Sequence, residues 1–65
     1  MKISETKFRI ALARNSIGIK ELSSAINVST QTLYAYTSSK RNPSTKMLGI
    51  MANALNVDVT ELIDE

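Results

Sequence analysis

The stretch that decides the fold runs from residue 18 to residue 37 and reads GIKELSSAINVSTQTLYAYT. Apolar residues recur at helical spacing on both sides of a short interruption, Asn27-Val28-Ser29. Asn27 can end a first helix, because asparagine tolerates the left-handed conformation better than most residues that carry a side chain. Ser29 can begin a second helix, roughly Thr30–Thr37, as its N-cap. The stretch therefore predicts two short helices joined by a three-residue bend.

These two helices meet the geometric requirements of a helix-turn-helix. Ser23 is small enough for the second helix to cross the first at that point. Val28 can fill the apolar space behind the turn, and Leu22 and Leu33 are suitable inward anchors on the two helices. With Asn27 at the turn, every requirement is met at the right spacing.

The outward face of the second helix carries groups that can recognise DNA bases. Gln31 can form two hydrogen bonds with an adenine edge, and the methyl group of Thr30 can pack on a thymine methyl. Tyr34 lies one turn later and can reach a base or a phosphate. In isolation, the polar triplet Thr30-Gln31-Thr32 is more often only the start of a soluble helix. After a bend of this kind, we expect it to read DNA.

The rest of the chain predicts three further helices and no strand, so we expect an all-α domain of five helices. Ser4 can cap a first helix that ends near Arg14, and Ser44 can cap a fourth one after the polar loop that Pro43 closes. Asp58 and Glu61 form the capping box of a short fifth helix. The expected inward side chains are Ile3, Phe8, Ala11, Leu12, Leu22, Ala25, Ile26, Leu33, Tyr36, Leu48, Met51, Ala52, Leu55 and Leu62.

Composition limits the possible functions. A chain of 65 residues forms one domain, and without cysteine or histidine it lacks thiolate nucleophiles and the usual zinc ligands. Its two glycines, Gly18 and Gly49, make no phosphate-binding loop. We therefore expect no enzyme, cofactor, metal or small-molecule ligand. No apolar run reaches the ~20 residues of a membrane span, and no secretion signal is evident, so we expect a cytoplasmic protein without a membrane partner.

Charge is distributed unevenly along the chain. All eight Lys and Arg residues lie within residues 1–57, where the only acidic residues are Glu5 and Glu21. The last eight residues carry four acidic groups and no basic one. A polyanion such as DNA could approach the central part without repulsion by like charges. The charge pattern alone is equally compatible with a solvated basic face that has no partner.

From about Phe8 to Ile63 the chain resembles the lambda-repressor/Cro-like family of helix-turn-helix domains, also called XRE-type regulators. The matching residues are Leu22-Ser23, Asn27-Val28-Ser29, Thr32-Leu33, Lys40-Arg41-Asn42-Pro43-Ser44, Ala54-Leu55-Asn56-Val57-Asp58 and Glu61-Leu62. The resemblance implies a repressor whose third helix enters the major groove of double-stranded DNA. It also implies a homodimer bound to a palindromic operator.

The resemblance assigns expected roles to individual residues. Base contacts are expected from Thr30, Gln31, Tyr34 and Ala35. Phosphate contacts are expected from Gly18, Ile19, Lys20, Ser29, Thr32, Ser39, Lys40, Arg41 and Asn42. The dimer interface is expected at Ile50, Val59 and Ile63.

The chain departs from the family pattern in four places. Many relatives have Gln where this chain has Ile19, and glycine where it has Ser39 and Asn27. Many also pair a buried Arg with a Glu at the positions held here by Leu12 and Thr37. Loss of both charges together is physically coherent, because loss of one alone would leave a buried charge unpaired at a cost of ~3–5 kcal/mol.

Two questions remain open at the level of sequence. Ile10, Ile50, Val59 and Ile63 are hard to place in the core of a monomer. They are either scattered exposed aliphatic residues or part of a subunit interface. The alternative to a DNA-binding regulator is a protein-interaction module, such as an antitoxin or the target of an antirepressor, that would use the last three as its main surface.

Overall fold

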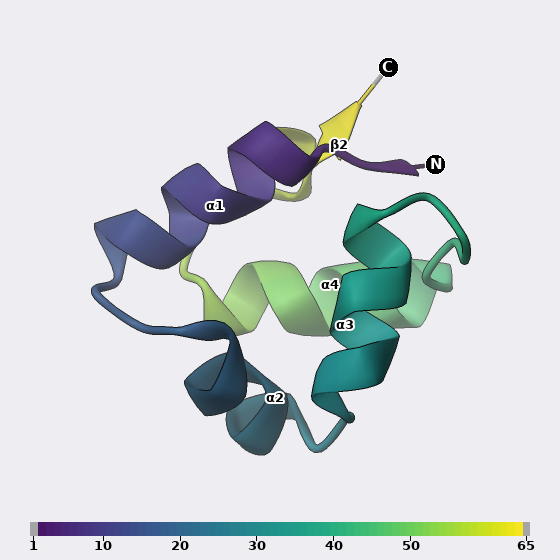
Figure 1. The fold of residues 1–65 in the computed structure, drawn as a ribbon. Coiled ribbons are helices and arrows are strands. Elements are labelled where there is room, and N and C mark those ends of the chain that lie inside the picture. The colour runs from purple at the N-terminus through teal and green to yellow at the C-terminus, as the bar shows by residue number, and fades with distance from the viewer. Residues whose placement is uncertain (1, 65) are drawn as a thin grey trace.

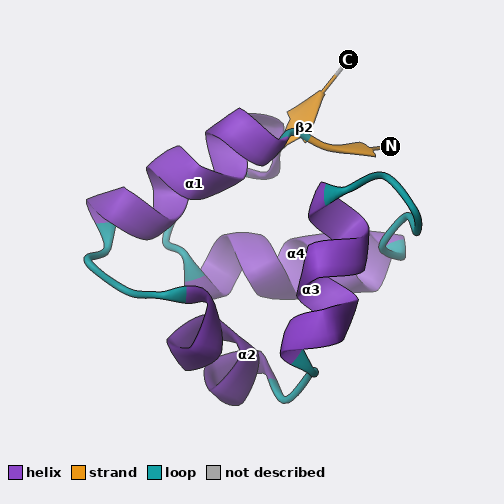
Figure 2. Cartoon of the chain, in the orientation of Figure 1, coloured by secondary structure: helices purple, strands orange, loops and turns teal. Residues whose placement is uncertain are grey.

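The computed structural model describes residues 2–64. Within this range the chain forms four α-helices, one 3₁₀ helix and a two-stranded sheet (Figures 1 and 2). The helices α1, α2 and α3 surround α4, and the first and last described segments, β1 and β2, lie side by side near the start of α1 (Figure 1). In chain order the elements are β1 (Lys2–Ile3), α1 (Glu5–Arg14), α2 (Ile19–Ile26), α3 (Thr30–Thr37), α4 (Thr45–Ala54), η1 (Val59–Glu61) and β2 (Ile63–Asp64).

Serine side chains begin three of the helices, as the sequence predicts. Ser4 Oγ accepts a hydrogen bond from the backbone N–H of the third residue of α1, at 3.3 Å. Ser29 and Ser44 do the same for α3 and α4, both at 3.1 Å. Each such cap satisfies a backbone donor that has no partner inside its helix, which explains why these helices start where they do.

The prediction of five helices and no strand is wrong at the two ends of the chain. The capping box of Asp58 and Glu61 forms, but the segment that it starts is a single 3₁₀ turn of three residues. After Leu62 the chain extends, and β2 pairs antiparallel with β1, with Ile3 opposite Ile63. The backbone N–H of Ser4 donates to the carbonyl of Leu62 at 2.7 Å and fixes the start of α1 beside this sheet.

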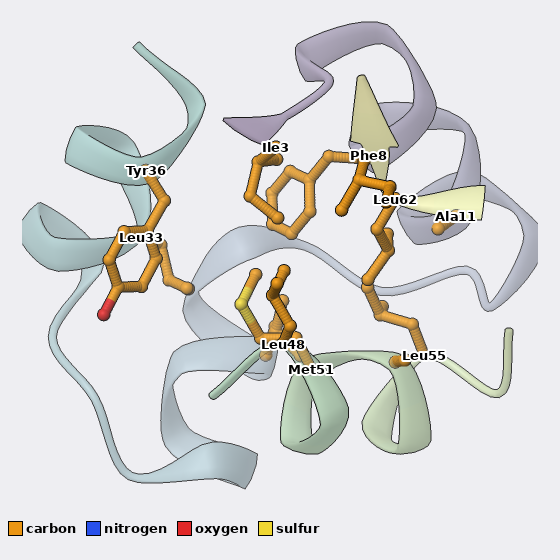
Figure 3. Close-up of a cluster of buried hydrophobic side chains, with 12 residues drawn as sticks. Ile3, Phe8, Ala11, Leu33, Tyr36, Leu48, Met51, Leu55 and Leu62 are labelled. Carbon is orange, nitrogen blue, oxygen red and sulfur yellow. The ribbon is translucent and has the colours of Figure 1, made fainter. Parts of the chain in front are cut away.

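The core contains apolar side chains from every α-helix and from both strands (Figure 3). Ile3, before the cap of α1, and Phe8, within it, are both buried in this cluster, consistent with the expected hydrophobic staple. The largest fully buried side chains are Phe8, Leu22, Leu33, Leu48, Met51, Leu55 and Leu62.

Three side chains depart from the expected burial. Ala25 is exposed rather than inward, because Leu22, Ser23 and Ile26 form the inner face of α2. Leu12 and Ile26 are only half-buried at the edge of the core. None of the helices described within residues 2–64 has the length and apolarity that a membrane span requires.

Candidate nucleic-acid interface

The bend between α2 and α3 is built as the sequence predicts. Asn27 has the left-handed conformation, with φ of 59° and ψ of 44°. The backbone N–H groups of Asn27 and Val28 both donate to the carbonyl of Ser23, and Ser29 is extended. Val28 is half-buried against the core, and the buried Ser23 donates its hydroxyl to the carbonyl of Lys20 at 2.8 Å. α3 therefore leaves α2 at a fixed turn, and the two helices do not form one continuous rod.

α3 has a buried face and an exposed face. Leu33 is completely buried and Tyr36 is 7% exposed, so these two side chains attach the helix to the core. On the other side Gln31 is exposed and Tyr34 is 56% exposed. Ala35, which is also expected to contact a base, is half-buried. The outer face thus presents an amide and a phenol that have no role in the packing of the core.

Thr30 was expected to face outward together with Gln31, but it is half-buried. Thr32 is also half-buried, and its hydroxyl lies 2.8 Å from that of Ser29, which caps the helix. Two of the hydroxyl groups expected at phosphates are therefore already engaged with each other. Gln31 and Tyr34 remain the most accessible reading groups of this helix.

The start of α2, an expected phosphate site, already holds an anion. Gly18 is extended, and its backbone N–H donates to the Glu21 carboxylate at 3.0 Å. Lys20 is exposed, whereas Ile19 is half-buried against the core. A phosphate at Gly18 would have to displace this carboxylate. Sequence reasoning overlooked Glu21, although a glutamate three positions after an N-cap can accept a hydrogen bond from the backbone N–H of the cap.

The loop after α3 presents positive charge on a fixed backbone. Ser39, where relatives have glycine, has a φ of 64°. The backbone N–H groups of Lys40 and Arg41 both donate to the carbonyl of Ala35, at 3.1 and 3.3 Å. The side chains of Lys40, Arg41 and Asn42 are exposed, and neither cation belongs to an ion pair found within residues 2–64. Both charges are therefore available to a partner.

Two surface hollows are lined in part by residues of α3. An open one of about 450 Å³ brings together Gln31, Tyr34, Ala35 and Lys40, which the sequence assigns to DNA, and also Glu5 of α1. The other has a volume of about 220 Å³ and lies between α1 and α3. It is lined by Glu5, Phe8, Arg9, Leu12, Ile19, Tyr34 and Thr37. Leu12 and Thr37, which hold the positions of a buried ion pair in many relatives, thus line the same hollow.

The expected dimer residues have different environments. Ile63, expected at the subunit interface, is 5% exposed, and its side chain lies in the core of the single chain. The reason is its pairing with Ile3 in the sheet, which directs it inward. Ile50 and Val59 are half-buried, and Ile10 is 54% exposed.

The acidic end of the chain has a structural role. The backbone and side chain of Thr60 donate hydrogen bonds to Asp58 and lower the pKa of its carboxyl. The pKa of Glu61 is lowered by the backbone N–H of Asp58 and by Arg14, whose guanidinium is 2.7 Å away. Residues 2–64 contain no cluster of acidic side chains suited to hold a metal ion.

Two short helices are joined by a turn with one residue, Asn27, in the left-handed conformation. The second helix has an exposed polar face beside basic residues. Together these features define a helix-turn-helix domain. The chain matches the family model HTH_3, described as helix-turn-helix, over residues 10–62, and it belongs to this family. It is accordingly a DNA-binding transcription regulator of the XRE type. Comparison with curated proteins and with solved structures gives no match.

Proposed function

We propose that the protein is a sequence-specific repressor of the Cro type, which binds a palindromic operator as a homodimer and inserts α3 into the major groove. The observation that carries this proposal is the division of α3 into two faces. Leu33 and Tyr36 fix the helix to the core, while Gln31 and Tyr34 are exposed and have no structural task. A major groove admits one α-helix, and an exposed amide is suited to the paired donor and acceptor of adenine.

Specificity and affinity come from different parts of this surface. Gln31 and Tyr34 read base edges, and the methyl groups of the half-buried Thr30 and Ala35 pack on a thymine methyl. Lys40 and Arg41 neutralise phosphates, and the start of α2 meets the backbone on the other side of α3. Base contacts set which sequence is preferred, whereas phosphate contacts set the affinity for all sequences.

The size of the DNA-reading surface supports the proposal of a dimer. One α3 covers a single half-site, and two copies placed ~34 Å apart would read successive major grooves. Ile50 and Val59 are half-buried apolar residues of α4 and η1, and they are the remaining candidates for the contact between subunits. Repression would then depend on how much of the operator is occupied, and therefore on the concentration of the protein.

Selection of bound sites from a random DNA pool tests the proposal directly. A palindromic consensus is expected, with half-sites one helical turn apart. Gln31→Ala should reduce discrimination at one base pair by ~1–3 kcal/mol, while Lys40→Ala should weaken binding to all sequences alike. A Gln31→Ala protein that loses the same affinity for operator and random DNA would contradict the role of α3. Absence of binding to any duplex at low salt would favour a protein-interaction module.

A further inference from the structure

The edge of α1 that faces α3 carries an ion pair with no structural task in the core. Arg9 Nη2 lies 3.3 Å from Glu5 Oε2, one helical turn away, and the two side chains are 76% and 58% exposed. Sequence reasoning gave neither residue a role in DNA binding. An exposed pair of this kind contributes only ~0–1 kcal/mol to stability. Its partners can therefore separate at little cost.

The position of this pair connects it with the DNA-facing surface. Arg9 and Glu5 line the 220 Å³ hollow together with Tyr34 of the reading face and Ile19 at the start of α2. Glu5 also lines the larger hollow that contains Gln31 and Lys40. The pair thus lies between the start of α2 and the outer face of α3, where the backbone of a duplex in contact with both would pass.

We propose that Arg9 is a further DNA-backbone contact, and that Glu5 holds its guanidinium in the free protein until a phosphate replaces the carboxylate. This inference rests on the proposed insertion of α3 into the major groove. A guanidinium fits two oxygens of a phosphate as well as it fits a carboxylate, so the exchange conserves its hydrogen bonds. Glu5, left beside the polyanion, weakens binding to every duplex and reduces nonspecific occupancy.

The other arginine of α1 is a matched control. Arg14 is also exposed and also paired with one carboxylate, that of Glu61, at 2.7 Å. It lines a different hollow, however, together with Ile10, Val57 and Thr60 and without any residue of α3. Arg9→Ala and Arg14→Ala therefore remove the same charge from the same helix, on two different sides.

The test measures binding to a random duplex and to a selected operator by fluorescence anisotropy over a range of salt concentrations. Arg9→Ala should weaken both complexes by about fivefold. It should also reduce the slope of log K against log salt by about 0.9, the value for one phosphate. Arg14→Ala should leave the slope unchanged. Arg9→Lys should keep the slope, because it keeps the charge, and Glu5→Gln should tighten both complexes.

The outcomes separate this inference from the proposed function. Equal slopes for Arg9→Ala and Arg14→Ala, with wild-type protein and Gln31→Ala behaving as expected, would overturn the role of Arg9 alone. A wild-type protein that binds no duplex would overturn the proposed function instead. Urea unfolding of each variant verifies that it is folded. If Arg9→Ala does not fold, Arg9→Gln takes its place, because it also removes the charge and is expected to reduce the slope by the same amount.

Discussion

Replacement of Ser39 by glycine should stabilise the protein, although it removes a side chain. Ser39 has a φ of 64°, in the left-handed region that glycine adopts without steric cost. Its neighbour Ser38 is an ideal control, because it has the same side chain and a φ of −90°. Both residues precede Lys40 and Arg41 directly, so the pair compares the same substitution at two backbone conformations.

The magnitude follows from two opposing terms. The left-handed conformation costs a residue with a Cβ atom ~1–2 kcal/mol, and Ser39→Gly removes this cost. Glycine loses more conformational freedom on folding than serine does, which lowers the free energy of unfolding by ~0.5–1 kcal/mol. The net gain in the free energy of unfolding is then about 0–1.5 kcal/mol. Ser38→Gly has only the second term, together with the loss of a hydrogen bond from Ser38 Oγ to the carbonyl of Ala35, and should destabilise the protein.

Urea unfolding followed by circular dichroism gives both values. The midpoint should rise for Ser39→Gly and fall for Ser38→Gly, with no change in the slope of free energy against urea concentration. For a domain of this size a gain of ~1 kcal/mol corresponds to a rise in Tm of about 4–8 °C. If both substitutions lowered the midpoint by similar amounts, the left-handed strain assigned to Ser39 would be refuted.

Two other perturbations probe the end of the chain. Ile63→Ala should lower the free energy of unfolding by about 2–5 kcal/mol, because this side chain is only 5% exposed and lies in the core. The loss should be the same at all protein concentrations in urea titrations; a loss that shrinks on dilution would instead place Ile63 at a subunit interface, because wild type and variant are then both monomeric. Asp58 and Glu61 have lowered pKa values, so their contribution to stability is complete above the ordinary values of 3.8 and 4.5 and is lost as pH falls through the lowered ones. Thermal melts below pH 4.5 should therefore show a steeper loss for wild type than for Asp58→Asn/Glu61→Gln, and equal slopes would contradict the pKa shifts.

Features that depend on neighbouring residues could be predicted from the sequence. The caps of α1, α3 and α4 and the left-handed turn at Asn27 follow from interactions within three or four residues, and all are present. The sheet could not be predicted, because strands of two residues are too short to show an alternating pattern. The burial of Ile63 could not be predicted for the same reason, since its pairing with Ile3 directs it inward.

The candidate site shows the same limit. Gln31 and Tyr34 could be assigned from helical spacing alone, and both are exposed. Glu21 could have been found from its position three residues after Gly18. Arg9 could not, because its relation to Tyr34 exists only once α1 packs beside α3. A contact between elements that are distant in the chain leaves no periodic signal in a single sequence.

The exposed ion pair of α1, Glu5 with Arg9, lies beside the two positions at which many relatives have a buried ion pair. In relatives with a buried Arg and Glu, separation of the pair would leave a charge uncompensated at a cost of ~3–5 kcal/mol, so the pair is fixed. Here Leu12 and Thr37 stand at those positions, and the charges beside the same hollow, Glu5 and Arg9, are exposed to solvent. An exposed pair contributes at most ~1 kcal/mol and can exchange partners. This chain therefore lacks charges at the positions of that buried pair and has, on the same edge of α1, an exposed pair that can exchange partners, which is the property that the proposed role of Arg9 requires.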